Sequence, residues 1–227
     1  MFSLVSPSYD IINRISTFGF DQIWRKRAAK ECLKNEPEQI LDLCCGTGDL
    51  SVELSKKASA GAKIIALDFS ENMLNIAREK VLKRGFANVD FFHADVADMP
   101  FTDNYFDAIG ISFAFRNLTY HNPDSNKFLQ EILRVLKTGG RFVIIETSQP
   151  ENILFRKLFH IYLKLIVPAL GGLISGRYKA YRYLGQSAIH YYNSEEVRRI
   201  LLSAGFSSVT SKGYLSGISR IYISLKL

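Results

Sequence analysis

The sequence contains little cysteine and begins with nothing that resembles a secretion signal. Its three cysteines are Cys32, Cys44 and Cys45. They are too few for a disulfide framework and lack the spacing of a zinc site. The first 18 residues carry Asp10, Asn13 and Arg14 at helix-like intervals instead of a basic segment followed by an apolar one. We therefore expect a cytoplasmic protein that holds no metal.

Extremes of composition are also missing. Hydrophobic residues make up 47% of the 227 residues and charged residues 22%, which excludes disordered, collagen-like and coiled-coil chains. There is no internal repeat and no low-complexity tract, so we expect a single domain over residues 1–227.

Acidic residues are scarce in the last third of the chain. Residues 1–150 hold 18 basic and 19 acidic residues, whereas residues 151–227 hold 11 basic and only 3 acidic ones. A basic region on a nearly neutral body indicates an anionic partner, such as membrane headgroups, nucleic acid or an acidic substrate. The alternative is a basic surface that is merely solvated.

Short apolar runs alternate with helical patterns between residues 39 and 147, which predicts an α/β fold with a parallel sheet. We expect strands at 39–44, 64–68, 89–93, 108–112 and 142–146, and helices at 49–58, 70–84, 126–137 and 194–204. Two further strands, at 208–212 and 219–225, predict an antiparallel end to the sheet. An N-terminal helical segment (1–35) and a helical insertion (151–193) complete the domain.

A glycine turn follows the first predicted strand, in the segment Leu41–Leu50. Gly46 and Gly48 allow the backbone to approach a ligand closely, and the chain then opens directly into a helix. The third glycine of a dinucleotide fingerprint is missing, and no lysine follows, so a phosphate cradle is not favoured. Asp42 and Asp49 flank the turn instead, which suits a ligand with a cationic end.

Polar residues also end the next three predicted strands. Asp68 is placed to accept hydrogen bonds from two ribose hydroxyls, Asp95 from an adenine amino group, and Ser112 ends the fourth strand. Carboxylates without an accompanying basic residue fit a nucleoside that carries no phosphate, and S-adenosylmethionine is such a molecule. Taken one at a time, each acid has the alternative role of a helix cap or turn residue.

These segments resemble the quinone-biosynthesis C-methyltransferases, which act on demethylmenaquinol and on the matching ubiquinone precursor. The resemblance covers nearly the whole chain and includes the segments Tyr9–Asn13, Leu41–Leu50, Leu67–Leu74, Phe115–Thr119, Glu146–Pro150 and Lys179–Leu184. The glycine turn is common to class I methyltransferases, whereas the last three segments are close to this family alone. Two departures from the family pattern, at Tyr120-His121 and Tyr191-Tyr192-Asn193, fall on the expected acceptor side.

The resemblance implies a class I methyltransferase fold, a Rossmann-like seven-stranded sheet with helices on both faces and a reversed last strand. It implies S-adenosylmethionine contacts from Thr47, Asp68, Asp95, Val96 and Ser112. It also implies that the methyl acceptor is a prenylated naphthoquinol, and it leaves open whether benzoquinols are methylated as well.

Methylation of a ring carbon needs a phenolate, because deprotonation of a ring hydroxyl places negative charge on the adjacent carbon. Arg116 and Asn117 follow the fourth predicted strand, and we expect them to hold the phenolate oxygen. Arg116 has the alternative role of a structural ion-pair partner. Tyr9, Tyr181 and His121 are candidate acid–base groups, with packing or a solvated loop as the alternative for each.

The segment 153–174 is strongly apolar, yet Arg156, Lys157, His160 and Lys164 fall on one helical face. This pattern is too charged to span a bilayer and suits a helix that lies on the inner surface of the cytoplasmic membrane. The alternative is a lid that packs on the protein or on a second subunit in a homodimer.

Other functions remain open at this point. A methyltransferase for another lipophilic molecule differs only in its acceptor, and a nucleic-acid methyltransferase would account for the basic C-terminal part. The basic residues there are interleaved with apolar ones, and no RNA-recognition motif is present, so we expect no nucleic-acid partner. A dehydrogenase lacks the third glycine, and a membrane adaptor would leave the acidic pocket unused.

Overall fold

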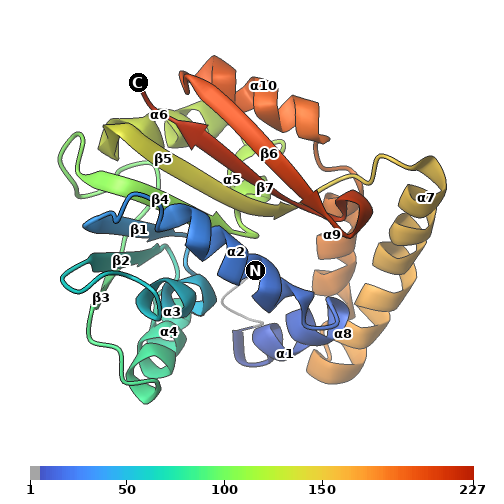
Figure 1. The fold of residues 1–227 in the computed structure, drawn as a ribbon. Helices are drawn as coiled ribbons and strands as arrows, with labels where there is room; N and C mark the ends of the chain where they lie inside the picture. The colour runs from blue at the N-terminus through green and yellow to red at the C-terminus, as the bar shows by residue number, and fades with distance from the viewer. Residues whose placement is uncertain (1–5) are drawn as a thin grey trace.

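A seven-stranded sheet forms the centre of the protein, whose computed structural model describes residues 6–227, with side chains from Asp10 onwards. The strands are β1 (Gln39–Leu43), β2 (Lys63–Asp68), β3 (Val89–His93), β4 (Phe106–Ser112), β5 (Leu136–Thr147), β6 (Ser208–Tyr214) and β7 (Ser219–Leu225). They lie in the order β3-β2-β1-β4-β5-β7-β6, as Figure 1 shows. Strands β1 to β5 pair in parallel, and β7 runs antiparallel to both of its neighbours. The predicted fold class is confirmed.

Strand β5 begins six residues earlier than the sequence indicates. The helix expected to reach residue 137 ends at Val135 instead, and the chain enters the sheet at once. Leu136 pairs with Phe106, and after a register shift Arg141 pairs with Ala108. Gly139 adopts a positive φ of 79° within this bulge. This glycine therefore allows the strand to bulge and does not end a helix.

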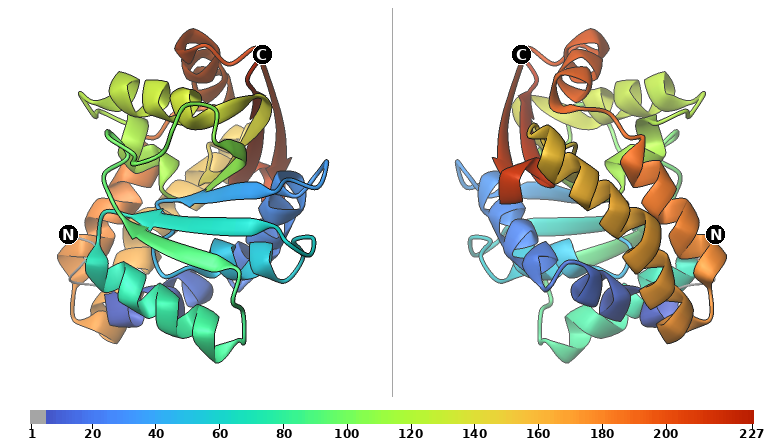
Figure 2. Two further views of the ribbon diagram at one scale, coloured as in Figure 1. Left: turned by 90° about the vertical axis from the view of Figure 1, so that its left-hand side faces the viewer. Right: turned by 90° about the vertical axis from the view of Figure 1, so that its right-hand side faces the viewer.

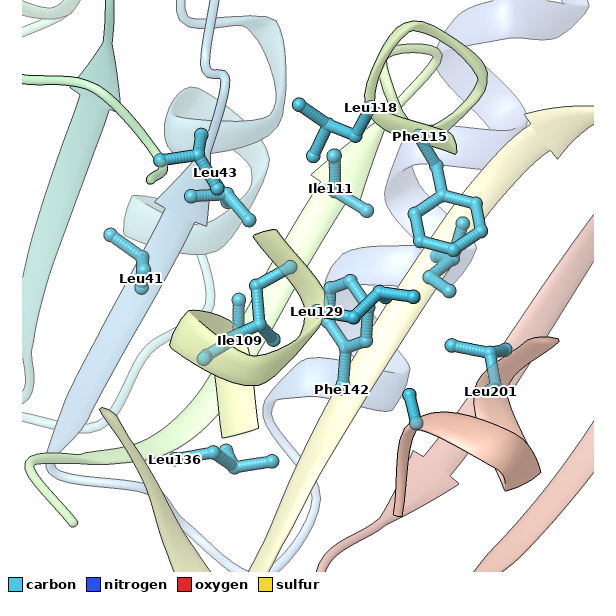
Figure 3. Packing of buried hydrophobic residues seen from close by; sticks show 14 of the residues in the cluster. Leu41, Leu43, Ile109, Ile111, Phe115, Leu118, Leu129, Leu136, Phe142 and Leu201 are labelled. Carbon is cyan, nitrogen blue, oxygen red and sulfur yellow. The ribbon is translucent and has the colours of Figure 1, made fainter. Parts of the chain in front are cut away.

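Helices cover both faces of the sheet because successive strand residues point to opposite sides. Leu41 and Leu43 pack on one face with α6 (Ser125–Val135) and α10 (Ser194–Ala204), in the cluster that Figure 3 shows. Ile40 packs on the other face with α2 (Phe20–Cys32) and α3 (Asp49–Ser55). Helix α4 (Glu71–Lys83) contributes Leu74 beside Ala66, and the five-residue α5 (Phe115–Thr119) follows β4.

The remaining helices form a layer at one end of the sheet (Figure 2). They are α1 (Ser6–Ser16), α7 (Ile153–Ile161), a π-helical turn (Tyr162–Ile166), α8 (Val167–Ser175) and α9 (Tyr178–Ile189). Ile12, Phe159, Leu163, Val167 and Tyr181 make their common core. Two helices approach closely here, since a Cβ on Gly171 would lie 2.1 Å from the Tyr181 ring.

The insertion presents much of its apolar surface to solvent. Leu154, Leu158, Ile161 and Leu165 are each more than half exposed. The predicted polar face is divided: Lys157 and Lys164 are exposed, whereas Arg156 and His160 are half-buried. Within residues 6–227, only the segment Ile153–Ser175 is long and apolar enough to cross a membrane, and 28% of its apolar window is buried in the protein. Length and composition alone do not distinguish a spanning helix from one that packs on the protein.

Candidate active site

Two neighbouring cavities open where the parallel strands end. One, which we call the glycine-turn cavity, has a volume of about 560 Å³ and lies beside the turn after β1. The other, the apolar cavity, has a volume of about 360 Å³ and lies between the sheet and the helical layer. Arg25 and Phe113 line both, so the cavities meet at these two side chains. Open α/β sheets bind ligands at this edge, where the strand order reverses between β1 and β4.

The backbone around the glycine-turn cavity is held in unusual conformations. Cys44 follows β1 with a φ of 53°, and Phe113 follows β4 with a φ of 56°. Left-handed φ values are costly for side chains other than glycine, and such residues concentrate at binding sites. Gly46 has a φ of 55°, and a Cβ there would meet nothing within 4 Å, so the turn leaves open space for a ligand.

Asp68 is fixed at the end of β2 by two backbone amides. The N–H of Gly46 donates to Oδ2 at 2.8 Å, and the N–H of Ser70 donates to Oδ1 at 2.9 Å. Burial raises the pKa of this carboxyl despite these two hydrogen bonds. Each carboxylate oxygen has a further lone pair, so the side chain can accept two vicinal hydroxyls, such as those of a ribose.

Four more of the predicted cofactor residues line the same cavity: Thr47, Asp95, Val96 and Ser112. Asp95 is exposed and accepts the N–H of Ala97 at 2.8 Å, while Val96 is buried beside it. Thr47 donates to Asp10 of α1 at 2.6 Å, and Ser112 accepts from Nε of Arg25 at 3.1 Å. The hydrogen bond between Arg25 and Ser112 joins residues that lie 87 positions apart in the sequence.

The expectation of carboxylates without basic neighbours is wrong. Lys80 of α4 donates to Asp49 at 2.7 Å and to Asp10 at 2.6 Å. Nη1 of Arg25 also lies 3.7 Å from Asp49. Burial would raise the pKa of Asp49, but Arg25 and Lys80 outweigh it and the pKa is lowered. The carboxylate of Asp49 is thus ion-paired with Arg25 of α2 and Lys80 of α4, two helices that are distant from it in sequence.

Asp42 and Gly48 do not line the cavity, although the sequence placed both at the cofactor. Asp42 is fully buried, points to the opposite side of β1 from Leu41 and Leu43, and accepts the hydroxyl of Ser51. A Cβ on Gly48 would lie 2.9 Å from the Cβ of Ala77, so this glycine lets α3 pack closely against α4. In this structure both residues support the turn from behind the cavity wall.

The apolar cavity is lined by aromatic and aliphatic side chains of the sheet end and the helical layer. Among them are Trp24, Phe113, Phe159, Tyr162, Leu163 and Tyr181. Four charged groups interrupt this lining and are all buried: Asp21, Arg25, Arg116 and Glu146. Asp21 pairs with Arg25, whose guanidinium also lies over the ring of Phe113. The cavity therefore offers an apolar volume with charge at the end where it meets the other cavity.

Arg116 and Asn117 are adjacent in sequence but line different cavities. Arg116 is 7% exposed and lies in the apolar cavity, whereas Asn117 is exposed and lines the glycine-turn cavity. The guanidinium of Arg116 lies 3.9 Å from the carboxylate of Glu146, and the backbone N–H of Arg116 donates to the same carboxylate at 3.0 Å. The buried Nε of Arg116 has no acceptor within residues 6–227. This geometry suits a guanidinium that receives an anionic oxygen.

The candidate acid–base residues are distributed unevenly. Tyr181 is 2% exposed and lines the apolar cavity. Tyr9 lies on α1, but its side chain lies outside the described part of the structure. His121 is exposed, packs on the ring of Tyr120, and lines neither cavity.

Sequence reasoning missed four residues of the apolar cavity: Asp21, Trp24, Arg25 and Glu146. Glu146 ends a predicted strand at the same sheet edge as the other polar residues, so its position carried a usable signal. The other three lie on α2 with no local feature that indicates a cavity.

Burial raises the pKa of Cys44 and Cys45 well above the usual thiol value, so both line the turn as neutral side chains.

Comparison with known proteins matches nearly the whole chain to one family. Residues 1–226 match the model of the ubiE/COQ5 methyltransferase family. A protein of Thermus thermophilus named demethylmenaquinone methyltransferase is 43% identical over 223 residues, which cover 98% of each chain. One of the same name from Oceanobacillus iheyensis is 38% identical over 226 residues, covering 100% of this chain and 93% of the relative.

Solved structures share the fold. A SAM-dependent methyltransferase from Aquifex aeolicus superposes with a TM-score of 0.61 at 25% identity, covering 88% of this chain and 89% of that one. A putative methyltransferase from Haloferax volcanii, in complex with its Trm112 activator, gives a TM-score of 0.68 at 18% identity and covers 99% of this chain and 96% of that one. The chain belongs to the ubiE/COQ5 methyltransferase family and is an S-adenosylmethionine-dependent methyltransferase.

Proposed function

We propose that this enzyme methylates a ring carbon of demethylmenaquinol, as the names of its relatives indicate. The observation that carries the proposal is the apolar cavity, which meets the glycine-turn cavity at Arg25 and Phe113. It contains the guanidinium of Arg116, whose Nε has no acceptor among the described residues. A naphthoquinol is a flat apolar ring system with two hydroxyls, and both its apolar and its polar parts find complementary groups there.

The glycine-turn cavity suits S-adenosylmethionine, which supplies an electrophilic methyl group when bound. In this assignment Asp68 accepts the two ribose hydroxyls, while Asp95 and Val96 contact the adenine. Gly46, Thr47 and Ser112 lie beside the remainder of the molecule at the ends of β1 and β4. The open space at Gly46 is the feature that fits a ligand lying directly against the backbone.

The residues of the apolar cavity have roles that follow from their charge. A ring hydroxyl must lose its proton before the adjacent carbon becomes nucleophilic, and Arg116 stabilises the phenolate that results. Glu146 lies 3.9 Å from that guanidinium and is placed to receive the proton, directly or through Tyr181. Asn117 lines the cavity on the cofactor side, and Tyr9 on α1 remains a candidate acid–base residue. Holding the ring carbon against the methyl group is the main contribution of the surrounding aromatic wall.

Transfer of labelled methyl from S-adenosylmethionine tests the proposal. The acceptors are reduced demethylmenaquinol and, as the control, the oxidised quinone, which has no hydroxyl to ionise. Product from the reduced form alone is expected. If the enzyme binds S-adenosylmethionine and neither form yields product, the quinol assignment is wrong and another lipophilic acceptor takes its place. A reduced benzoquinol in the same assay tests the ubiquinone precursor.

We also propose that the enzyme binds peripherally to the inner face of the cytoplasmic membrane through α7 and the helices around it. Leu154, Leu158 and Ile161 are exposed beside Lys157 and Lys164, a combination that suits the boundary between acyl chains and anionic headgroups. A substrate with a lipid tail resides in that membrane, so binding through this surface would bring the enzyme to its substrate.

Sedimentation with vesicles tests this surface. Vesicles rich in phosphatidylglycerol should bind the protein, and the double variant Lys157→Glu/Lys164→Glu should bind them several-fold more weakly. Lys212→Glu, an exposed charge change on β6, is the matched control and should bind normally. Stable dimerisation without lipid, abolished by the same double variant, would instead assign the surface to a second copy of the chain. Resistance to alkaline carbonate extraction would indicate a spanning segment.

A further inference from the structure

The residues of the apolar cavity divide into a buried charged end and an exposed apolar rim. The charged end consists of four side chains that are between 0% and 7% exposed: Asp21, Arg25, Arg116 and Glu146. Arg25 also lines the glycine-turn cavity, so the two cavities meet at this end. Three other lining residues are far more accessible: Phe18 is 80% exposed, Leu158 57% and Leu215 42%. The cavity thus changes from polar and closed at one end to apolar and open at the other.

The rim is formed by three segments that are distant in sequence but lie on one face of the molecule (Figure 2, right). Phe18 occupies the turn between α1 and α2, Leu158 lies on α7, and Leu215 lies in the turn between β6 and β7. The Phe18 ring lies 6.5 Å from that of Tyr162, whose hydroxyl donates to the carbonyl of Ser16 at 2.7 Å. These contacts fix the α1–α2 turn against the π-helical turn below Leu158.

Two rim residues hold strained backbone conformations that expose them. Phe18 has a φ of 52° and Leu215 a φ of 46°, both in the left-handed region that side chains other than glycine rarely adopt. At 80% exposure Phe18 gains little from burial in the protein, and Leu215, at 42%, leaves much of its apolar surface in water. Their placement is accounted for if an apolar part of a ligand covers them.

We propose that the isoprenoid tail of the methyl acceptor leaves the apolar cavity between Phe18, Leu158 and Leu215. The inference rests on the proposed function, which supplies a ligand with a polar ring and a long apolar tail. The ring faces the charged end, where the methyl group arrives, and the tail passes over the rim. Beyond the rim the tail meets the exposed apolar side chains of α7, beginning with Leu154 and Ile161.

Trp24 provides a direct measurement of binding that does not depend on catalysis. It is the only tryptophan in the chain, is 4% exposed, and lines the apolar cavity. Quinones quench indole fluorescence at short range, so quenching of Trp24 reports occupancy of the cavity. The probes are demethylmenaquinone with two isoprene units and tail-less 1,4-naphthoquinone, both at one fixed concentration of a non-ionic detergent.

The test variant is Phe18→Asn/Leu158→Gln, because asparagine tolerates the left-handed conformation at position 18. The control variant is Leu173→Gln, which removes a leucine that is even more exposed (85%) from α8 outside the cavity. We expect the test variant to lose about tenfold in affinity for the prenylated quinone and to keep its affinity for naphthoquinone. The control should match the wild-type protein with both ligands.

Equal loss of affinity for both ligands would overturn the proposal, because the rim would then contact the ring. Unchanged affinity for the prenylated quinone would also overturn it, because the tail would leave elsewhere. If the wild-type protein binds the prenylated quinone no more tightly than naphthoquinone, the proposed exit of the tail is wrong even where methyl transfer is observed. If quenching of Trp24 depends on the tail but no methyl transfer occurs, the exit of the tail is supported and the proposed reaction is refuted.

Discussion

The buried carboxyl of Asp42 makes the stability of this protein depend on pH. Asp42 is fully buried behind the glycine turn, and the hydroxyl of Ser51 is its hydrogen-bond donor. Burial raises its pKa from 3.8 to about 7, which the Ser51 hydrogen bond only partly counteracts. The folded protein therefore keeps this proton over a pH range in which the unfolded chain has released it.

The sign and size of the effect follow from this difference. The Asp42 contribution to the free energy of unfolding is largest below pH 4 and falls by about 1.4 kcal/mol per pH unit until pH 7. Between pH 5 and pH 8 the loss amounts to about 3 kcal/mol. Asp42→Asn has no proton to lose and keeps an acceptor for Ser51, so its stability should lack this decline.

Urea denaturation of both proteins at several values between pH 5 and pH 8 measures the effect. The difference in unfolding free energy between Asp42→Asn and the wild-type protein should grow by about 3 kcal/mol in favour of the variant as the pH rises. Ser51→Ala removes a hydrogen bond that lowers the pKa of Asp42, so its decline should extend to higher pH. A difference that stays constant with pH would refute the raised pKa.

Three further substitutions test other parts of the site. Asp68→Ala should abolish S-adenosylmethionine binding in calorimetry while leaving the circular dichroism spectrum unchanged; undiminished affinity would contradict its role at the ribose. Arg116→Gln should lower kcat about 100-fold or more without changing cofactor affinity, whereas Arg156→Gln, on α7 outside both cavities, should leave kcat unchanged. Gly48→Ala should lower the free energy of unfolding by about 2–4 kcal/mol, from backbone strain plus the clash with Ala77. Gly61→Ala, with a φ of 94° and open space around it, should lose only the strain, and equal losses would show that the clash is not felt.

The sheet and one side of the site could be predicted because their signals are local. Strands of period two and polar residues at strand ends are visible in short windows of sequence, and parallel strands place those ends at one edge. The position of Asp68, Asp95 and Ser112 around one cavity could be predicted in this way. The beginning of β5 was missed because its bulged first part contains Gly139 and Gly140, which in a short window resemble a turn and not a strand.

The other side of the site depends on contacts that short windows do not contain. Asp21, Trp24 and Arg25 lie on a helix whose buried face looks like any other packing surface until the sheet is placed against it. The prediction that Arg116 and Asn117 act on one oxygen rested only on their adjacent positions after the fourth predicted strand. The short helix α5 turns the two side chains into separate cavities instead.

Helix α1 joins the two cavities mechanically. Asn13 and Ser16 of this helix form part of the wall of the apolar cavity, while Asp10 contacts Lys80 and Thr47 beside the glycine turn. Movement of α1 away from the apolar cavity would separate Asp10 from Lys80 and Thr47 beside the glycine-turn cavity. Because salt screens the Asp10–Lys80 ion pair, the free energy that holds α1 over both cavities should fall as the ionic strength rises.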